Sequence, residues 1–266
     1  MKSTTLTFYG GVNEIGGNKI LLKDGKAKVF FDFGQSFTMG TDYFTSSLGP
    51  RWIYGLKDYF EFGLLPKIKG LYGEKQLTYT DLRHSEPYFD AIFLSHAHFD
   101  HVAHVVFLDE KIPVFCGSGT KLFLESMEET SYSTLGEHPY KTFRTGDIIK
   151  IDPLEIEPIH VDHSVPGAYG FIIQTSKGKI VYTGDLRAHG PKKEMTEEFI
   201  AKASEGKPVA LITEGTRIVE KRPRTNYSES EVKEKSNEIV SGANKIVFVA
   251  HHVRDIDRFR TIYEVA

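Results

Sequence analysis

Short apolar runs separated by turns occupy the first two thirds of the chain, and this pattern favours β-strands. The first two runs flank a glycine-rich turn, residues 10–17, and the third ends in an Asp and a Gly. We predict strands over residues 4–9, 18–23, 28–34, 91–94, 112–115, 147–151, 154–159, 169–175 and 179–183. Between these strands, helices are expected over 101–108 and 119–133.

The last third of the chain alternates strands with helices. We predict a buried strand over 209–213, a further strand over 246–250, and helices over 192–203, 228–240 and 255–265. Ser228 and Glu231 stand three positions apart at the start of the second of these helices, which is the spacing of a capping box.

Residues 37–83 interrupt the strand pattern, because they are rich in Tyr, Phe, Leu and Gly and contain Pro66. We predict an inserted helical or irregular segment that covers one side of the functional site. Its aromatic residues either stack on bases or pack the insertion onto the core, and packing is the commoner use of such residues.

The composition is that of an ordinary soluble protein, with 266 residues, 40% hydrophobic and 26% charged. No apolar run approaches the roughly 20 residues of a membrane span. The single cysteine, Cys116, excludes an internal disulfide and suits a reducing cytoplasm, where we expect the protein. With a net charge of −3, binding of nucleic acid would require a local basic patch, for which residues 217–224 are a candidate.

The densest chemistry follows the predicted strand 91–94, in the segment Ser95-His96-Ala97-His98-Phe99-Asp100-His101. His96 and His98 lie two apart, so their side chains can leave an extended backbone on the same side. Asp100 and His101 come after the end of the strand and can reach a second point. One loop can therefore offer ligands to two metal ions.

Two later strand ends offer further ligands. His163 follows the strand 154–159 and could complete the metal site of His96 and His98. His160 competes for this role, but we prefer His163 because a Ser-Val-Pro-Gly turn follows it directly. Asp185 follows the strand 179–183 and could bridge two metals, with Asp100 and His101 on the second.

Imidazole and carboxylate ligands suit two zinc ions first, with manganese and iron as alternatives. With metal ions about 3.5–4 Å apart, a hydroxide that bridges them becomes a nucleophile at neutral pH, and the cations stabilise an attacked phosphate. Asp32 closes the strand 28–34 and could hold the metal-binding loop by hydrogen bonds.

These motifs, in this order and each at a strand end, resemble the metallo-β-lactamase superfamily. The resemblance implies an α+β fold, an αββα sandwich with a dinuclear site at one sheet edge. The implied metal ligands are His96, His98, Asp100, His101, His163 and Asp185.

Three stretches resemble the β-CASP nucleases and ribonuclease J within that superfamily: residues 10–18, residues 162–168 together with 182–187, and residues 213–217. Glu214 matches the acidic residue that these nucleases carry after a strand. The resemblance implies that Asp100, Asp185 and Glu214 are catalytic, Glu214 by orienting the site.

The resemblance also implies the domain organisation. Residues 1–215 would form the metallo-β-lactamase domain, and residues 216–266 would begin a β-CASP-like domain or supply the final strand and helix of the sandwich. If residues 216–266 begin a β-CASP-like domain, the last ligand of the second metal ion is missing from the chain. If they supply the final strand and helix of the sandwich, as in the tRNA 3′-processing nuclease that this alternative resembles, His251 is that ligand.

The predicted function is a metal-dependent phosphodiesterase that cleaves RNA by attack of the bridging hydroxide, with RNA as the partner, no membrane, and a homodimer left open. Two alternatives remain. One is a small-molecule hydrolase acting on an ester, thioester or lactone, and the other is an inactive truncated form that binds RNA.

Overall fold

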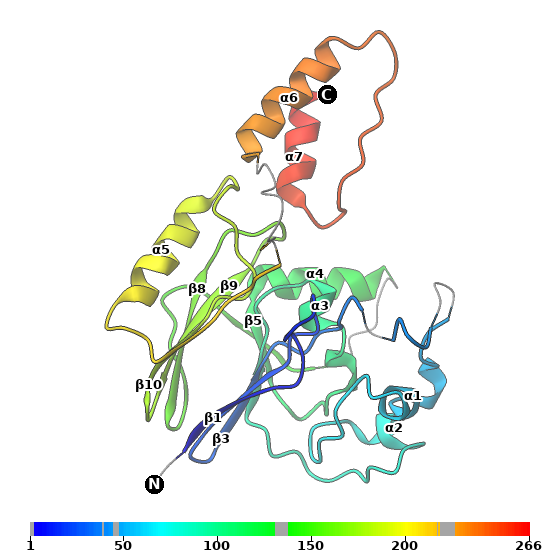
Figure 1. The fold of residues 1–266 in the computed structure, drawn as a ribbon, viewed down its shortest axis with the longest axis vertical. Coiled ribbons are helices and arrows are strands. Elements are labelled where there is room, and N and C mark those ends of the chain that lie inside the picture. Colours follow the sequence, from blue (N-terminus) through cyan, green and yellow to red (C-terminus); the bar gives the residue numbers. More distant parts are fainter. Residues whose placement is uncertain (1–2, 39, 45–47, 131–137, 217, 219–226) are drawn as a thin grey trace.

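Two β-sheets form the centre of the molecule in the computed structural model, which describes residues 3–38, 40–44, 48–130, 138–216, 218 and 227–266 (Figure 1). The first sheet contains β1 to β6 in that order: Thr4–Phe8, Ile20–Asp24, Ala27–Phe31, Ala91–Phe93, Val114–Gly117 and Tyr140–Phe143. The second has the order β11-β10-β9-β8-β7, and the bounds of β7 to β11 are Ile149–Ile151, Leu154–His160, Tyr169–Thr175, Gly178–Tyr182 and Ala210–Ile212.

Helices cover the outer faces of both sheets. Helices α1 to α7 run Lys57–Glu61, Glu74–Leu77, Phe99–Val102, Ser118–Glu129, Lys193–Ser204, Glu229–Ser241 and Ile256–Val265. Two 3₁₀ helices, η1 and η2, run Trp52–Tyr54 and Val105–Phe107. Helix α4 packs on the outer face of the first sheet, and α5 packs on the second through Phe199.

One hydrophobic core lies between the two sheets, where the alternate residues of each strand point inward. Phe31 and Phe93 of the first sheet meet Phe171 of the second, with ring centroids 5.3 and 6.0 Å from it. Helix, sheet, sheet and helix therefore form four layers, which confirms the predicted α+β sandwich.

The sheet pairing brings the ends of β3 and β4 together. These strands are parallel, with Phe31 opposite Phe93, and β4 is also parallel to β5. Because parallel strands end at the same edge, the residues that follow β3 and β4 lie next to each other. Asp32 and the loop after β4 are thus brought to the same point.

The predicted insertion, residues 37–83, contains η1, α1 and α2 in its described part and is otherwise irregular. Its buried side chains, among them Leu56, Phe60 and Tyr72, belong to the core on the outer face of the first sheet. Phe60 and Tyr72 therefore serve packing, whereas Tyr43 and Trp52 are exposed. The predicted domain boundary at residue 215 stays a prediction.

The predicted helix over 101–108 is wrong, because the structure has the shorter α3 and η2 there. Two backbone hydrogen bonds explain the break. Phe33 donates to the carbonyl of His101 at 2.8 Å, and His104 donates to the carbonyl of Phe33 at 3.0 Å. The loop after β4 is thus hydrogen-bonded to the end of β3 instead of continuing its own helix.

Two strand predictions also need correction. The strand over 209–213 is not buried, since β11 lies at the edge of its sheet and Leu211 is 60% exposed. Residues 246–250 form no strand, and Phe248 there is 87% exposed. A strand requires a hydrogen-bonding partner, and none is assigned to this segment among the described residues. Strand β6 was not predicted.

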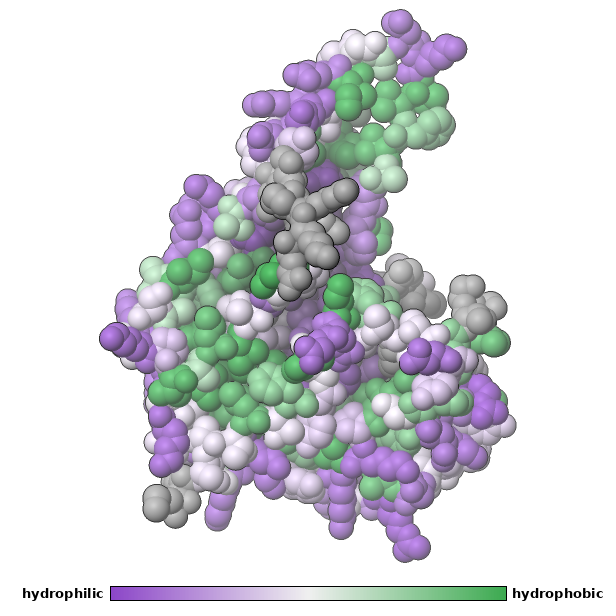
Figure 2. Space-filling model, in the orientation of Figure 1, coloured by the Kyte–Doolittle hydropathy of each residue, from purple (hydrophilic) through white to green (hydrophobic). Residues whose placement is uncertain are grey.

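Helices α6 and α7 with the segment between them form what we call the C-terminal hairpin, which projects from the sandwich (Figure 1). Exposed hydrophobic side chains gather on it and on the face where β1 and β11 lie (Figure 2). Among the described residues, no helix combines the length and apolar character needed to cross a membrane.

Candidate metal centre

The metal loop, residues 95–101, starts just after β4 and runs into α3. His98 is the N-cap of α3 and still has an extended backbone, with φ −74° and ψ 148°. Asp100 and His101 lie inside the helix. The change from extended chain to helix turns the side chains of one short loop toward two neighbouring points.

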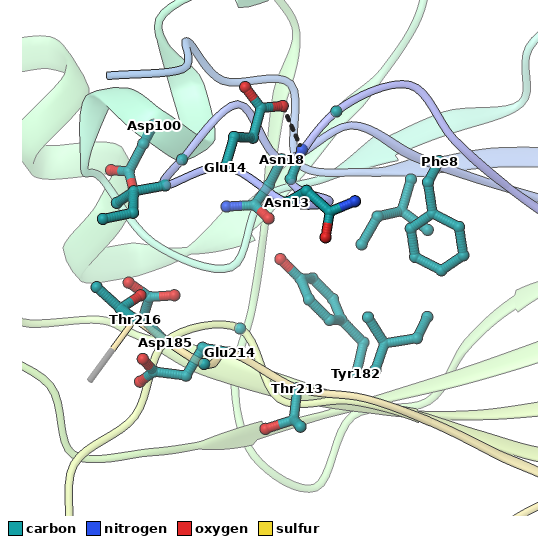
Figure 3. Close-up of a pocket in the computed structure, with 18 of the residues that line it drawn as sticks. Phe8, Asn13, Glu14, Asn18, Asp100, Tyr182, Asp185, Thr213, Glu214 and Thr216 are labelled. Carbon is teal, nitrogen blue, oxygen red and sulfur yellow. Dashed lines mark hydrogen bonds between the residues drawn. The ribbon is translucent and has the colours of Figure 1, made fainter. Parts of the chain in front are cut away.

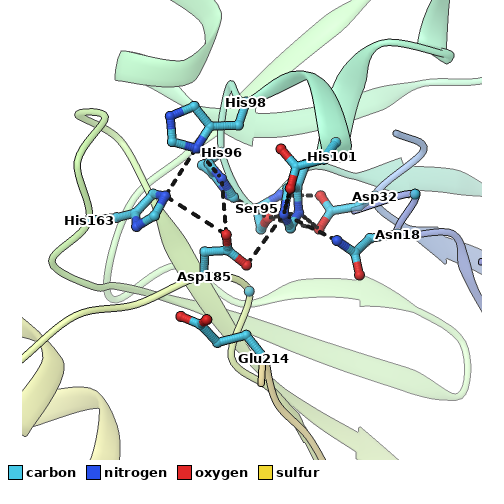
Figure 4. A network of polar contacts seen from close by, with 12 residues as sticks. Asn18, Asp32, Ser95, His96, His98, His101, His163, Asp185 and Glu214 are labelled. Carbon is cyan, nitrogen blue, oxygen red and sulfur yellow. Dashed lines mark hydrogen bonds and ion pairs between the residues drawn. The ribbon is translucent and has the colours of Figure 1, made fainter. Parts of the chain in front are cut away.

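The first donor group consists of His96, His98 and His163, as predicted. Nδ1 of His98 lies 3.0 Å from Nε2 of His96 and 3.0 Å from Nε2 of His163 (Figure 4). The ligand atoms of this group lie within 4.8 Å of one another. Three imidazole nitrogens directed at one point are a donor set that fits a divalent metal ion.

The second donor group consists of His96, His101 and Asp185. Oδ1 of Asp185 lies 3.3 Å from Nε2 of His101, and its Oδ2 lies 4.0 Å from Nε2 of both His96 and His163. One carboxylate thus faces both groups, the arrangement expected of a bridging ligand. Oδ2 of Asp100 lies 3.4 Å from Nε2 of His101, at the margin of this group.

Burial and neighbouring charges set the protonation of these side chains. Burial lowers the pKa of His98 to about 3 and that of His163 to about 4, so both offer lone pairs at neutral pH. Burial disfavours the charged forms of Asp185 and His101, so by itself it would raise the pKa of Asp185 and lower that of His101. The attraction between them prevails, lowering the pKa of Asp185 to about 2 and, together with Asp32, raising that of His101 well above its usual value. A cation at Nε2 of His101 would replace its proton.

Asp32 holds the metal loop from the end of β3. Its carboxylate accepts hydrogen bonds from the backbone nitrogen of Ser95 at 2.7 Å, from the Ser95 hydroxyl at 2.8 Å and from the Tyr182 hydroxyl at 2.5 Å. It also lies 2.7 Å from Nδ1 of His101. When Nδ1 donates to Asp32, Nε2 of His101 is left to face Asp185.

The family of the chain follows from comparison with known proteins. A family model described as a beta-lactamase superfamily domain matches residues 69–224. The chain belongs to the beta-lactamase superfamily. This confirms the resemblance read from the metal motifs.

Several members of the superfamily resemble the chain. It is 28% identical to ribonuclease J of Sinorhizobium meliloti over 183 residues, which are 66% of this chain and 32% of that protein. It is 27% identical to ribonuclease J of Mycobacterium tuberculosis over 267 residues, covering 98% of this chain and 42% of the other. The chain therefore spans less than half the length of these curated relatives.

A solved structure shares the fold. A protein of unknown function from Enterococcus faecalis V583 superposes with a TM-score of 0.80 at 28% identity. The match covers 99% of this chain and 63% of that one. The superfamily fold therefore accounts for the sandwich that positions the two donor groups.

Glu214 follows β11 and lies beside Asp185 (Figure 3). Its Oε1 accepts a hydrogen bond from the backbone nitrogen of Leu186 at 3.2 Å, next to Asp185 in sequence. Burial, with the negative charge of Asp185, raises the pKa of Glu214. The contact suits an orienting role, and a catalytic role stays a prediction.

A cavity of about 480 Å³ opens beside Asp100, Asp185 and Glu214 (Figure 3). The glycine-rich turn predicted at residues 10–17 forms one wall, and Tyr182 and the end of β11 contribute to the other. Among the described residues that line it, none is Lys or Arg. Of the predicted basic patch at residues 217–224, only Ile218 lies within the described residues.

The rival ligands lie elsewhere. His160 stacks on Tyr169, with ring centroids 4.9 Å apart, and belongs to neither donor group. His251 is exposed and its ring lies against Phe259, so the structure does not bring it to the centre. Its neighbour His252 comes closer, with its ring 5.8 Å from that of His98.

The sequence reasoning missed the roles of Asn18 and Tyr182. Nδ2 of Asn18 lies 3.2 Å from Nε2 of His101, and the Tyr182 hydroxyl donates to Asp32. Both residues stand within stretches that resemble the β-CASP nucleases. The available signal for these roles was the position of Asn18 after a turn and of Tyr182 at a strand end. The contacts themselves could not be predicted, because they form only when the two sheets pack together.

Proposed function

We propose that the chain carries the metal centre of a hydrolase that cleaves phosphodiester bonds in RNA. The observation that supports this most directly is one carboxylate, Asp185, lying between two groups of histidine nitrogens. Relatives named ribonuclease J support RNA as the substrate. Because the chain spans less than half of those relatives, the activity of a longer protein is part of the proposal.

The roles follow from the donor groups. His96, His98 and His163 would hold one divalent ion, and Asp100, His101 and Asp185 would hold the other, with Asp185 between them. Zinc is the first choice, and manganese and iron are alternatives. When bound, two such ions supply a nucleophile from water at neutral pH and positive charge for the attacked phosphate.

Two residues, Asp32 and Glu214, orient the side chains that would bind the metal ions. Asp32 accepts from Nδ1 of His101 and so presents Nε2 of that residue to the second site. Glu214 accepts from the nitrogen of Leu186 and so fixes the turn that carries Asp185. We assign both as positioning residues.

His163→Ala and His160→Ala provide a matched test, since the two histidines lie three positions apart and only His163 belongs to a donor group. The parent chain, loaded with zinc or manganese, should cleave single-stranded RNA. His163→Ala should lose at least about 100-fold of that activity, because even indirect support of a metal ligand is worth 10–100-fold. His160→Ala should keep it. Equal activity of both variants would refute the assigned centre.

A small-molecule hydrolase is the second candidate, and the absence of Lys and Arg among the described residues lining the cavity favours it. A panel of chromogenic esters and thioesters, assayed beside RNA, separates the two. Turnover of an ester without cleavage of RNA would overturn the RNA proposal. Metal binding without any hydrolysis would instead favour an RNA-binding form.

A further inference from the structure

Arg187 lies two residues after Asp185 and is only 8% exposed, although it is charged. Its Nε donates to Oδ1 of Asp162 at 3.0 Å, and its Nη2 donates to Oδ2 of Asp257 at 2.9 Å. Its Nη1 lies 3.9 Å from Oε1 of Glu229. One guanidinium therefore joins carboxylates from two different parts of the molecule.

On one side, Arg187 connects the turns that carry two of the assigned metal ligands. Asp162 directly precedes His163 and is 2% exposed. The backbone nitrogen of Arg187 donates to the carbonyl of Asp162 at 2.8 Å, in addition to the side-chain pair. The Thr196 hydroxyl donates to the carbonyl of Arg187 at 3.0 Å and accepts from the nitrogen of Asp162 at 3.0 Å. The turns of His163 and Asp185 are thus held together.

The backbone at Gly190 encloses this pair. A Cβ atom at that position would lie 2.1 Å from Nε of Arg187 and 2.2 Å from Oδ2 of Asp162. No side chain fits in that space, so the Arg187–Asp162 pair is packed from this side as well. Such packing fixes the guanidinium in one orientation.

On the other side, Arg187 meets the C-terminal hairpin. Asp257 lies in α7 and Glu229 begins α6, where Arg258 binds it with hydrogen bonds of 2.7 and 3.0 Å. Among the described residues, the hairpin contributes no side chain to the three hydrophobic cores. Charged contacts therefore carry much of its attachment.

A second contact joins the hairpin to the metal loop. Arg254, in the segment between α6 and α7, is 7% exposed and lies over the ring of Phe99 at 4.0 Å from its centroid. Its Nη1 donates to the carbonyl of Ala97 at 3.4 Å, between the ligands His96 and His98. The hairpin thus touches the metal loop and the turn of Asp185 directly, and it reaches the turn of His163 through Arg187.

We propose that Arg187 is a positioning residue that couples docking of the C-terminal hairpin to the geometry of the metal centre. With Asp257 and Glu229 in place, the positive charge of the guanidinium is balanced, and the guanidinium keeps the turns of His163 and Asp185 at a fixed distance from each other. Without them, a buried cation beside the centre has lost partners, and the two turns lose part of their support. The proposal rests on the proposed metal centre but not on RNA as its substrate.

Asp257→Asn tests the coupling from the hairpin, with Glu264→Gln as the matched control. Both carboxylates lie in α7, but Glu264 pairs with Lys233 and Arg260 inside the hairpin. Asp257→Asn should bind zinc at least about five-fold more weakly, the lower end of typical coupling between sites, as measured by competition with a chromogenic chelator. Glu264→Gln should bind it as the parent does.

A double-mutant cycle with Arg187→Met separates coupling from a merely structural role. If both residues act through one contact, the double variant should lose no more zinc affinity than Arg187→Met alone. Additive losses would overturn the proposal. Arg187→Lys should restore little affinity, because an ammonium cannot bridge two carboxylates as a guanidinium fork does.

Hydrogen exchange of the metal-free chain provides a readout that does not depend on metal. Asp257→Asn should lose amide protection in the turns at residues 161–165 and 184–187, whereas Glu264→Gln should not. Unchanged protection there would refute the coupling. If the parent binds no zinc while the exchange result holds, the proposed metal centre fails and the coupling between hairpin and turns stands.

Discussion

Asp32 adopts a backbone conformation that few residues other than glycine tolerate, with φ at +57°. The conformation turns its buried carboxylate back toward Ser95, Tyr182 and His101 at once. A residue in that position must accept both the strained backbone and four polar contacts, and Asp combines a short side chain with a negative charge. The orientation of the His101 ring therefore depends on a residue that binds no metal.

Asp32→Asn tests this dependence, because Asn keeps the shape and tolerates the same backbone but loses the charge. We expect metal affinity to fall about 10–100-fold, since the Nδ1 proton of His101 loses a charged acceptor. Chelator competition measures the change. Asp24→Asn is the control, as Asp24 is also buried but binds Ser176 away from the centre. Equal losses in the two variants would contradict a specific role for Asp32.

Helix α6 shows how an element without a core can still be well formed. Its first turn has the predicted capping box, in which the Ser228 hydroxyl accepts from the nitrogen of Glu231 and the Glu231 carboxylate accepts from the nitrogen of Ser228. Glu229 is its one buried residue among those described. Local capping and charged contacts therefore replace the hydrophobic face on which most helices depend.

Ser228→Ala should destabilise α6 by about 1 kcal/mol, because the backbone nitrogen of Glu231 loses the Ser228 hydroxyl as its acceptor. The effect should appear as faster hydrogen exchange in α6, with exchange in β8 and β9 unchanged, since the helix opens independently of the sandwich core. Ser241→Ala, at the other end of α6, is the control. Faster exchange in the central strands would show that the helix and the sandwich unfold together.

The whole molecule has a sandwich with three hydrophobic cores and a hairpin attached mainly by charge. The assigned metal ligands come from three turns at one edge of the sandwich. In the sequence, His98 and His163 are 65 residues apart, and His163 and Asp185 are 22 residues apart. A metal ion held by all three turns would cross-link them. Bound metal should therefore contribute to the stability of the folded chain.

Removal of metal should lower the melting temperature. At a free zinc concentration 100 times the dissociation constant, binding adds about 2.7 kcal/mol, which corresponds to roughly 5–10 °C for a chain of this size. Thermal unfolding with zinc, and after chelation, measures the difference. His163→Ala should show a smaller difference than the parent, and His160→Ala an equal one. No shift in the parent would contradict the assigned centre.

Much of the site was predictable because its ligands follow strands that the apolar pattern marks. Strand ends alone placed His96, His98 and His163 in one group, and the structure brings their ring nitrogens together. The second group contains His96 together with His101 and Asp185, whereas Asp100 lies outside it with Oδ2 3.4 Å from Nε2 of His101. This difference depends on the side-chain directions within α3. Spacing along the chain does not specify such directions.

The sequence by itself determined most of the strands along the chain and the candidate metal ligands, because these depend on local periodicity and residue chemistry. The four-layer fold class followed from the resemblance of its motifs to the metallo-β-lactamase superfamily. Only the tertiary structure decided the rest. It left β11 at an exposed edge, gave residues 246–250 no strand partner in the described part of the chain, placed His251 away from the centre and joined Arg187 to the C-terminal hairpin. Each of these depends on which distant segments meet, and a local pattern carries no information about that.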